Sequence, residues 1–340
     1  MKSIISVRIN TELNQYNKPY RLCERKVPEC GKNELLVEIR AAGFCHSDLQ
    51  VLQGHFPAPL PLIASHEPAG IVRQVGRNVA GSWKPGDRVG VLNFKKACGE
   101  CAGCRQLQRK GGRKDPRFCH KREMAGFKHN GAFAQYMIAD PETTATAWGA
   151  LQKLRPEVKS GDTVGIVGIG GVGNLAVQFA KAMGYRVVAI DNRPEGRQLA
   201  IEAKEQLIPD LVIDPSAIDA DDQILAFTSD EGLSGIVVCT DSTQANTWSL
   251  QQLGSKGVIV PLGLPKDKWQ FDSNAVVFRE LTIRGSYVAD REEVEEMFKV
   301  VGKYGVASHL TMVEFNQIPT IVDRYLEKTL KGRLVVKIPH

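Results

Sequence analysis

Hydrophobic and polar residues follow two different patterns along the chain. In the first part, apolar residues alternate with polar ones or form short runs broken by glycine, proline and asparagine, as in 34–45, 69–76 and 86–94. An alternation with a period of two is typical of strands that bury one face. Because no long amphipathic helix interrupts these runs, we expect residues 1–145 to be rich in β-structure.

The second part of the chain alternates between strand-like and helix-like segments. Residues 162–192 contain an apolar strand, a turn with several glycines, an amphipathic helix and a second strand. Gly184 stands where such a helix commonly ends. Helix-compatible segments separate further apolar strands at 210–214, 235–240 and 257–263. This alternation predicts a parallel sheet that is covered on both faces.

The tail and the composition complete this picture. A strongly patterned helix is predicted at 291–305 and a last strand at 332–338. With 340 residues the chain exceeds the usual size of one hydrophobic core, so we expect two domains. The net charge of +6 is too small to indicate nucleic acid or an acidic membrane as a partner. Since we find no secretory signal and no membrane-spanning run, we expect a cytoplasmic protein.

Three glycines after the first strand of the second part form the pattern G-x-G-x-x-G, at Gly168, Gly170 and Gly173. The first permits a tight turn, the second lets the backbone approach a diphosphate, and the third lets helix and strand pack closely. Gly171 and Val172 begin the helix, whose free N–H groups can bind phosphate. We therefore predict that this turn binds a dinucleotide.

An acidic residue in the next strand indicates which dinucleotide is bound. Asp191 ends that strand, eighteen residues after Gly173. A carboxylate there accepts hydrogen bonds from the adenosine ribose and repels a 2′-phosphate, which favours NAD over NADP. Arg193 lies two residues further along the chain and can weaken this preference.

Four of the eight cysteines lie close together, at Cys98, Cys101, Cys104 and Cys119. Because disulfides are rare in the cytoplasm, this spacing indicates a metal site. Four thiolates complete the tetrahedral coordination of zinc, so the predicted site is structural and leaves no position for a substrate. The insert before the last cysteine is basic. We interpret it as a solvated loop and expect no nucleic-acid binding, because Phe118 is its only aromatic residue.

A second candidate metal site combines Cys45, which ends an apolar strand, with His66. Both side chains are common zinc ligands, and two ligands from separate segments can hold a catalytic zinc when a third joins them. Taken alone, residues of these types are more often ordinary members of a core.

Seven segments in a fixed order connect these features: GFCHSDL at 43–49, SHEPAGIVRQVG at 65–76, PGDRVGV at 85–91, CGECAGC at 98–104, GAFAQYM at 131–137, VGIGGVGNLAVQFAKAMG at 167–184 and IRGSYV at 283–288. Together they resemble the zinc-containing alcohol dehydrogenases of the medium-chain dehydrogenase/reductase superfamily, of the fungal and yeast-like type. The resemblance covers nearly the whole chain. It implies an α/β fold with a GroES-like β-rich catalytic domain, residues 1–145 with 287–340, and a Rossmann domain with a doubly wound parallel sheet, residues 146–286.

The resemblance also implies a role for each matching residue. Cys45 and His66 would be ligands of a catalytic zinc, and Glu67 would be the carboxylate that can approach or bind the metal. Asp48 would orient the histidine, and Ser47 would take the proton of the substrate. The cysteine quartet would hold a structural zinc.

For the cofactor, the resemblance implies that Ser286 lies beside the nicotinamide and Arg333 near the diphosphate. The implied activity is hydride transfer between an alcohol, or the matching aldehyde or ketone, and NAD(H), in a homodimer or homotetramer. One position departs from many relatives, because Gln50 stands where they have the histidine that ends a proton relay.

A larger departure concerns the third zinc ligand of the relatives, usually a cysteine before the first Rossmann strand. No cysteine lies between residues 120 and 238, and the segment is short around Thr144 and Ala145. A genuine deletion and an incorrect gene model both explain this gap. Glu67, Asp140 and Glu142 are the candidates to replace the missing ligand.

Two other functions remain as hypotheses. A zinc-free enoyl or quinone reductase of the same superfamily would usually lack Cys45, His66 and the quartet, and would usually take NADPH. A catalytically impaired dinucleotide-binding relative would bind the cofactor without turnover, and the missing third ligand is its support. Zinc content and cofactor preference distinguish these hypotheses from the leading one.

Overall fold

The computed structural model describes residues 7–79, 83–91, 94–95, 97–112, 115–139 and 146–340. The chain forms two compact units, Met1–Thr143 with Leu310–His340, and Thr144–His309. The first unit therefore combines both ends of the chain. In the described part of the chain, no helix is both long enough and apolar enough to cross a membrane.

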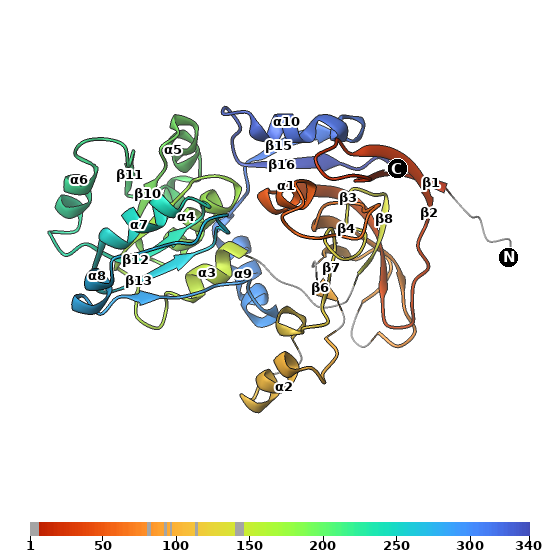
Figure 1. The fold of residues 1–340 in the computed structure, drawn as a ribbon, viewed down its shortest axis with the longest axis horizontal. Helices are drawn as coiled ribbons and strands as arrows, with labels where there is room; N and C mark the ends of the chain where they lie inside the picture. Colours follow the sequence, from red (N-terminus) through yellow and green to blue (C-terminus); the bar gives the residue numbers. More distant parts are fainter. Residues whose placement is uncertain (1–6, 80–82, 92–93, 96, 113–114, 140–145) are drawn as a thin grey trace. The chain divides into compact units, whose positions relative to one another are not determined.

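The first unit is built around a sheet with the strand order β15-β16-β3-β4-β5, in which β8 also pairs with β3 (Figure 1). Two small sheets, β1-β2 and β6-β7, accompany it. The strands are β1 (Val7–Glu12), β2 (Arg21–Lys26), β3 (Leu35–Phe44), β4 (Glu67–Val75), β5 (Arg88–Gly90), β6 (Phe94–Lys95), β7 (Glu123–Met124), β8 (Tyr136–Ala139), β15 (Leu310–Glu314) and β16 (Arg333–Lys337). The helices are α1 (His46–Leu52), α2 (Ala102–Arg109) and α10 (Ile321–Leu326).

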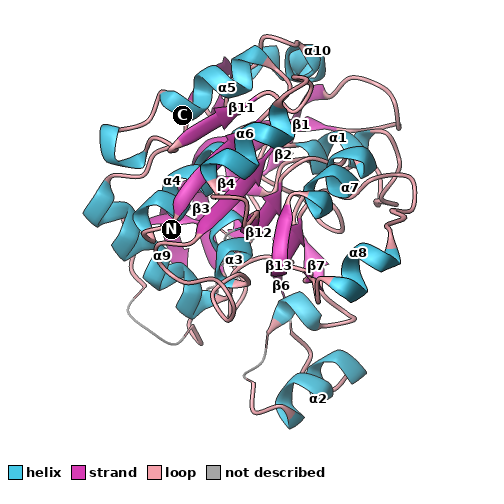
Figure 2. Cartoon of the chain, turned by 90° about the vertical axis from the view of Figure 1, so that its left-hand side faces the viewer, coloured by secondary structure: helices cyan, strands magenta, loops and turns pink. Residues whose placement is uncertain are grey.

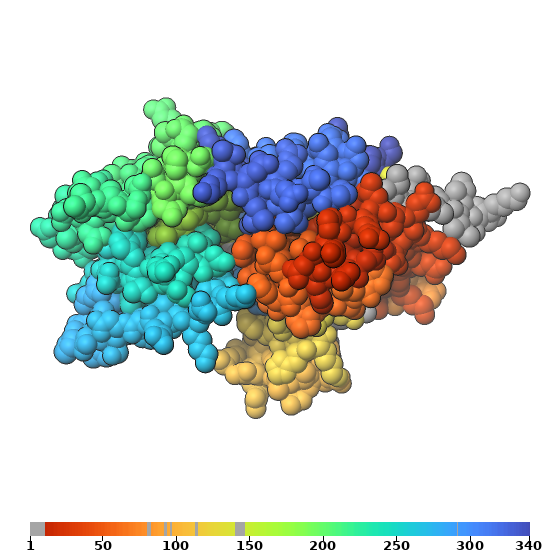
Figure 3. Space-filling model, turned by 45° about the horizontal axis from the view of Figure 1, so that its top comes forward, coloured from red at the N-terminus to blue at the C-terminus, as the bar shows by residue number. Residues whose placement is uncertain are grey.

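The two chain ends meet in this sheet because β16 pairs antiparallel with β3. In the space-filling view the C-terminal segment, coloured blue, lies against the N-terminal segment, coloured red (Figure 3). The core beneath them is aromatic as well as aliphatic: the rings of Phe44 and Phe133 stack with centroids 6.4 Å apart, and Tyr20 meets both edge-on. The β-rich character predicted from the alternating pattern is confirmed.

The second unit contains a six-stranded parallel sheet with the order β11-β10-β9-β12-β13-β14. This order, 3-2-1-4-5-6 when counted within the unit, is that of a Rossmann fold. The strands are β9 (Thr163–Val167), β10 (Arg186–Ile190), β11 (Leu211–Ile213), β12 (Leu233–Val238), β13 (Leu253–Pro261) and β14 (Thr282–Ile283). The helices are α3 (Thr146–Gln152), α4 (Gly171–Ala182), α5 (Pro194–Ile201), α6 (Ala220–Phe227), α7 (Thr243–Gln251), α8 (Ser273–Phe278) and α9 (Arg291–Tyr304).

Helices cover both faces of this sheet, as predicted. In β10, Val187 and Ala189 belong to one buried cluster, and Val188 and Ile190 to another, because successive side chains of a strand point to opposite faces. Helix α4 packs into the first cluster, while α6 and α7 pack into the second. Figure 2 draws these helices in cyan and the strands in magenta.

One segment lies in a different unit from the one expected. Residues 287–309, which the resemblance placed with the catalytic domain, belong to the second unit. The cause is the apolar face of α9: Val294 is buried in the same cluster as α4, and α9 packs on α3 and α4. A helix with one apolar face must bury it, and these two helices provide the surface.

A buried carboxylate in the first unit leads to a prediction about acid stability. Glu38 of β3 is 4% exposed and forms ion pairs with Arg73, at 2.5 Å, and with Arg40. The hydrogen bond from Arg73 lowers the pKa of Glu38, so its stabilising effect is present above the ordinary glutamate pKa and disappears as pH falls through the lowered value. We expect Glu38→Gln to cost about 2 kcal/mol of unfolding free energy at pH 7.

Urea unfolding of both proteins at several pH values measures this effect. The difference between wild type and variant should shrink toward zero in acid. A difference that stays constant with pH would show that the charge of Glu38 is not the cause. Glu24→Gln, on exposed β2, is the matched control and should change little.

Candidate metal and dinucleotide sites

Pairing of β3 with β4 brings the first candidate site together. Gly43 of β3 is the register partner of Glu67 in β4, so Cys45 and His66, at adjoining strand ends, become neighbours. Cys45 Sγ lies 3.3 Å from His66 Nε2. Two ligands of one tetrahedral zinc, a sulfur and a nitrogen, would be about 3.5 Å apart. The pair predicted from sequence is therefore juxtaposed at a distance that suits zinc.

Asp48 holds Cys45 and His66 in place through hydrogen bonds. Its side chain is fully buried and accepts hydrogen bonds from the backbone N–H groups of Cys45, at 3.0 Å, and Ser65, at 3.1 Å. Its Oδ1 also lies 3.2 Å from His66 Nδ1. With the proton on Nδ1, the ring donates to the carboxylate and directs the Nε2 lone pair toward Cys45. This is the arrangement in which a histidine binds a metal through Nε2.

The charges around His66 show how the proton and the metal compete. Burial lowers the pKa of His66, but the adjacent Cys45 and Asp48 raise it further, so the net shift is well above the ordinary value. A metal ion must displace this proton, because only the unprotonated nitrogen is a ligand. Metal binding here is therefore expected to weaken as pH falls.

Glu67 adds an oxygen to the cluster. One ligand atom from each of Cys45, His66 and Glu67 lies within 4.8 Å of the others. The carboxylate rests over Gly43, where a Cβ atom would come within 2.2 Å of Glu67 Oε2. Its Oε1 lies 3.4 Å from the guanidinium of Arg333 at the start of β16. Sulfur, nitrogen and oxygen donors in this number fit a catalytic zinc that keeps one open position.

Ser47 occupies the first turn of α1, directly after these ligands. Its backbone N–H donates to Cys45 Sγ at 3.3 Å, and Cys45 is the residue that caps the helix. Ser47 is partly exposed. Gln50, three residues later on the same helix, is buried. The helix thus places Ser47 next to Cys45 of the ligand cluster.

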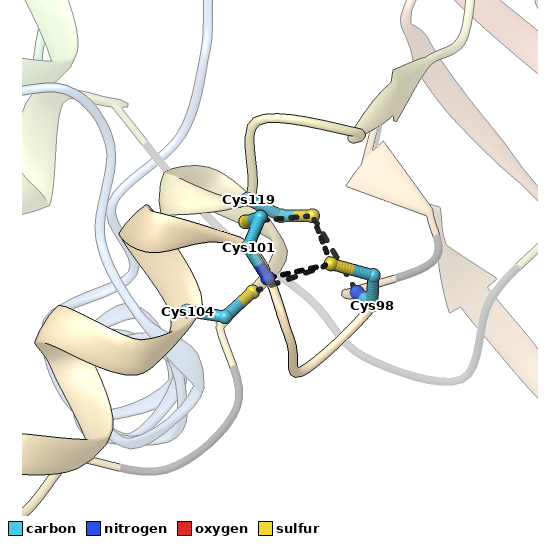
Figure 4. Close-up of side chains that lie close together, drawn as sticks. All are labelled: Cys98, Cys101, Cys104 and Cys119. Atoms are coloured by element: carbon cyan, nitrogen blue, oxygen red, sulfur yellow. Dashed lines mark hydrogen bonds between the residues drawn. The ribbon is translucent and has the colours of Figure 1, made fainter.

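The four clustered cysteines converge on one point (Figure 4). Cys98 Sγ lies 3.6 Å from Cys119 Sγ and 4.0 Å from Cys104 Sγ, and Cys101 Sγ lies 4.0 Å from Cys119 Sγ. The sulfurs of a tetrahedral zinc are about 3.8 Å apart. None of the four is in a disulfide. The quartet therefore has the dimensions of a closed zinc site.

Backbone groups prepare this quartet for a cation. N–H groups of Cys104 and His120 lower the pKa of Cys101 to about 5, so this sulfur is a thiolate at neutral pH. Backbone N–H groups also lower the pKa of Cys98. Burial raises the pKa of Cys104 to about 12, so this thiol gives up its proton only when a metal binds.

The insert in this lobe is more ordered than the sequence indicated. We interpreted residues 105–118 as a solvated loop, but α2 begins at Ala102 and ends at Arg109. Cys104 is its buried residue, and polar residues dominate the remainder of the helix. Gly111, with φ +77°, and Gly112 follow the helix and end it. The two glycines after Lys110 were the available signal for this helix end.

The dinucleotide turn has the geometry that its glycines predicted. Gly168 follows β9 with φ +86°, a conformation that side chains rarely adopt. Gly170 caps α4, and a Cβ there would meet nothing within 4 Å, so its backbone is open to a ligand. A Cβ at Gly173 would lie 2.0 Å from the carbonyl of Gly168. Gly171 and Val172 form the first turn, whose N–H groups fit a diphosphate.

Asp191 joins this turn to the end of β10. Its Oδ2 accepts from the N–H of Ile169 at 2.7 Å, and its Oδ1 from the N–H of Arg193 at 2.8 Å. The guanidinium of Arg193 also pairs with it at 3.3 Å. Gly196 of α5 leaves room for the carboxylate, since a Cβ there would lie 2.2 Å from Oδ2. Sequence reasoning missed Gly43 and Gly196. Each leaves space for a carboxylate that belongs to another part of the chain, Glu67 or Asp191.

Two of the predicted cofactor-binding residues, Ser286 and Arg333, belong to different units. Ser286, in the second unit, has a buried Oγ without a hydrogen-bond partner in the described part of the chain, which fits a ligand-facing hydroxyl. Arg333 belongs to the first unit and pairs with Glu67. Asp140 and Glu142, the other candidates for a third ligand, and the short segment at Thr144 and Ala145 lie outside the described residues.

Comparisons with known proteins agree with this geometry. Residues 31–149 match the alcohol dehydrogenase GroES-like domain, and residues 171–303 match the zinc-binding dehydrogenase model. An alcohol dehydrogenase of Rhizobium meliloti is 33% identical over 96% of this chain and 97% of its own length, and one of Geobacillus stearothermophilus is 31% identical over 96% and 98%. The structure of the alcohol dehydrogenase of Aeropyrum pernix superposes with a TM-score of 0.84 at 26% identity, covering 97% of this chain and all of that one. The chain therefore belongs to the zinc-containing alcohol dehydrogenases of the medium-chain dehydrogenase/reductase superfamily.

Proposed function

We propose that this protein oxidises an alcohol with NAD, or reduces the matching carbonyl compound, at a zinc held by Cys45, His66 and Glu67. The observation that carries the proposal is the chain of contacts from Asp48 through His66 Nε2 to Cys45 Sγ, at 3.2 and 3.3 Å. When bound, zinc supplies a Lewis acid that lowers the pKa of the alcohol, and NAD supplies the hydride acceptor. The quartet holds a second, structural zinc.

The protein's own residues then perform two tasks. Asp48 holds the His66 ring so that Nε2 faces the metal position. Ser47 takes the alcohol proton through its hydroxyl and passes it toward solvent. Gln50 cannot take up a proton, so the path from Ser47 would have to run through the cofactor ribose and water, or proton release would be slower than in relatives with a histidine there.

The adenosine end of the cofactor is selected by Asp191. Its carboxylate accepts the ribose hydroxyls and repels a 2′-phosphate, while the turn from Gly168 to Gly173 receives the diphosphate. Ser286 is proposed to contact the nicotinamide, and Arg333 the diphosphate.

A variant of Asp191 tests cofactor selection. We expect Asp191→Ser to weaken NADH binding about tenfold, because hydrogen bonds to a charged group are lost. NADPH binding should strengthen, because the repulsion disappears and the Arg193 guanidinium is released from its ion pair. Titration calorimetry with both cofactors gives the two constants.

Asp214→Asn is the control, since Asp214 pairs with Arg197 at 2.9 Å without capping the glycine turn. It should leave the NADH to NADPH ratio nearly unchanged. If Asp191→Ser weakened both cofactors equally, Asp191 would support the turn through Ile169 and would not select the cofactor.

Elemental mass spectrometry of the purified protein, followed by an NAD-linked assay with a panel of alcohols, tests the main proposal. Two zinc ions per chain and NADH formation are the expected results. One zinc ion with NADH binding but no turnover would favour a catalytically impaired relative. NADPH-linked reduction of an enone without zinc would favour an enoyl or quinone reductase.

We also propose a homodimer or homotetramer in the cytoplasm. Helix α8, which precedes β14 in the chain, carries Val277 and Phe278, whose side chains are 67% and 83% exposed. Large exposed apolar side chains favour association with a second copy. None of the eight cysteines forms a disulfide, which suits a reducing compartment. Light scattering after gel filtration measures the oligomeric state.

A further inference from the structure

Arg333 and the proposed metal use the same carboxylate. A carboxylate oxygen of Glu67 lies within 4.8 Å of the Cys45 and His66 ligand atoms. Its Oε1 is also 3.4 Å from the guanidinium of Arg333. The carboxylate therefore has two possible cationic partners, a metal ion bound by Cys45 and His66 or the guanidinium of Arg333.

Sheet geometry explains why a single carboxylate reaches both. The strand order β16-β3-β4 places the start of β16, with Arg333, and the start of β4, with Glu67, on either side of the end of β3. Gly43 of β3 lies between them and has no side chain to separate them. Any larger residue at Gly43 would occupy the space in which the carboxylate lies.

Partial burial strengthens the attraction between Glu67 and Arg333. The side chains of Glu67 and Arg333 are 30% and 19% exposed, so water screens their attraction less than at an open surface. Zinc coordinated by the carboxylate at about 2.1 Å would neutralise part of the negative charge that attracts Arg333. Metal binding through Glu67 therefore weakens this ion pair.

We propose that Arg333 sets the affinity of the Cys45–His66 site for zinc by competing with the metal for Glu67. The inference rests on the proposed catalytic site and assigns Arg333 as a positioning residue that acts through Glu67. An anion that draws Arg333 away would release Glu67 to the metal, so anion binding at Arg333 and zinc binding favour each other. The diphosphate of the proposed cofactor is an anion of this kind.

Four full-length proteins test the competition: wild type, Arg333→Gln, Glu67→Gln and the double variant. Zinc is removed from the weaker site with a mild chelator while the quartet stays loaded. Zinc is then titrated back against a chromophoric chelator. We expect Arg333→Gln to tighten zinc binding about fivefold. In the Glu67→Gln background, removal of Arg333 should have no effect, because the shared carboxylate is gone.

The background comparison separates competition from a general field effect. If Arg333 acted only as a nearby positive charge, its removal would instead tighten zinc binding equally in both backgrounds. Equal tightening in both, or no tightening by Arg333→Gln, would overturn the inference. Arg333→Lys, which keeps the charge, is the second variant and should bind zinc like wild type. Circular dichroism and the zinc of the quartet report whether each variant is folded.

The same zinc titrations distinguish failure of the proposed catalytic site from failure of the proposed role of Arg333. If none of the four proteins binds a second zinc, the proposed catalytic site fails and the inference fails with it. If wild type binds a second zinc and Arg333→Gln binds it no more tightly, only the role of Arg333 is overturned. Cobalt in place of zinc gives a further readout. Its visible spectrum should differ between wild type and Arg333→Gln, but not between Glu67→Gln and the double variant.

Discussion

Cys45→Ala is expected to abolish most alcohol oxidation, lowering kcat/KM by about a thousandfold or more. Cys45 contributes the thiolate of the proposed catalytic site, and its removal leaves His66 with one carboxylate as partner. A metal held by these two groups binds weakly, so the Lewis acid is lost. NADH binding should remain, because the dinucleotide turn belongs to the second unit.

Steady-state kinetics, zinc content and NADH titration on one preparation check this result. The variant should hold one zinc ion fewer than wild type and should still bind NADH. Cys30→Ala is the matched control, since Cys30 is a partly buried thiol near the backbone of Glu34 and outside both clusters. Full activity in Cys45→Ala would contradict the proposed site.

Cys119→Ser is expected to release the zinc of the quartet and to unfold the lobe around α2. Cys119 is fully buried, and its sulfur lies 3.6 Å from Cys98 and 4.0 Å from Cys101. Binding of a structural zinc supplies folding free energy directly, and few apolar side chains hold this lobe without it. We expect a loss of several kcal/mol of local stability, with cleavage in the lobe.

Limited proteolysis with mass spectrometry of the fragments locates the change. Wild type should resist cleavage between residues 98 and 119, and the variant should be cut there first. Treating wild type with a strong chelator should reproduce the pattern. Cys23→Ser should leave it unaltered, because Cys23 lies in β2. Equal resistance of wild type and Cys119→Ser would show that the lobe folds without metal.

Local patterns predicted the parts of the site that depend on neighbouring residues. The dinucleotide turn could be identified because all its glycines lie within six residues and each has a local reason. The quartet was recognisable for the same cause, since two short spacings place three thiols in one loop. Helix α2 was missed because its polar residues resemble a solvated loop, and a buried sulfur organises the helix.

Contacts between distant residues could not be predicted from such patterns. Glu67 and Arg333 are far apart in the sequence and meet only because β16 and β4 flank β3. Gly43 and Gly196 are needed because the carboxylates of Glu67 and Asp191 occupy the space where a side chain would lie. No local sequence pattern predicts these contacts. Similarly, α9 follows the Rossmann strands in sequence, and its place in the second unit depends on the apolar surface of α3 and α4.

The sequence by itself determined the chemistry available to this protein. It specifies a glycine turn with an acid at the end of the next strand and four thiols spaced for a closed zinc, because residue type and short spacing settle such features. Tertiary structure alone decided which groups act on each other. It placed Asp48 against the ring of His66, and it brought Glu67 close both to Cys45 and His66 and to Arg333. The physical reason is that electrostatic and metal-ligand interactions depend on distances of a few ångströms, and strand pairing sets those distances.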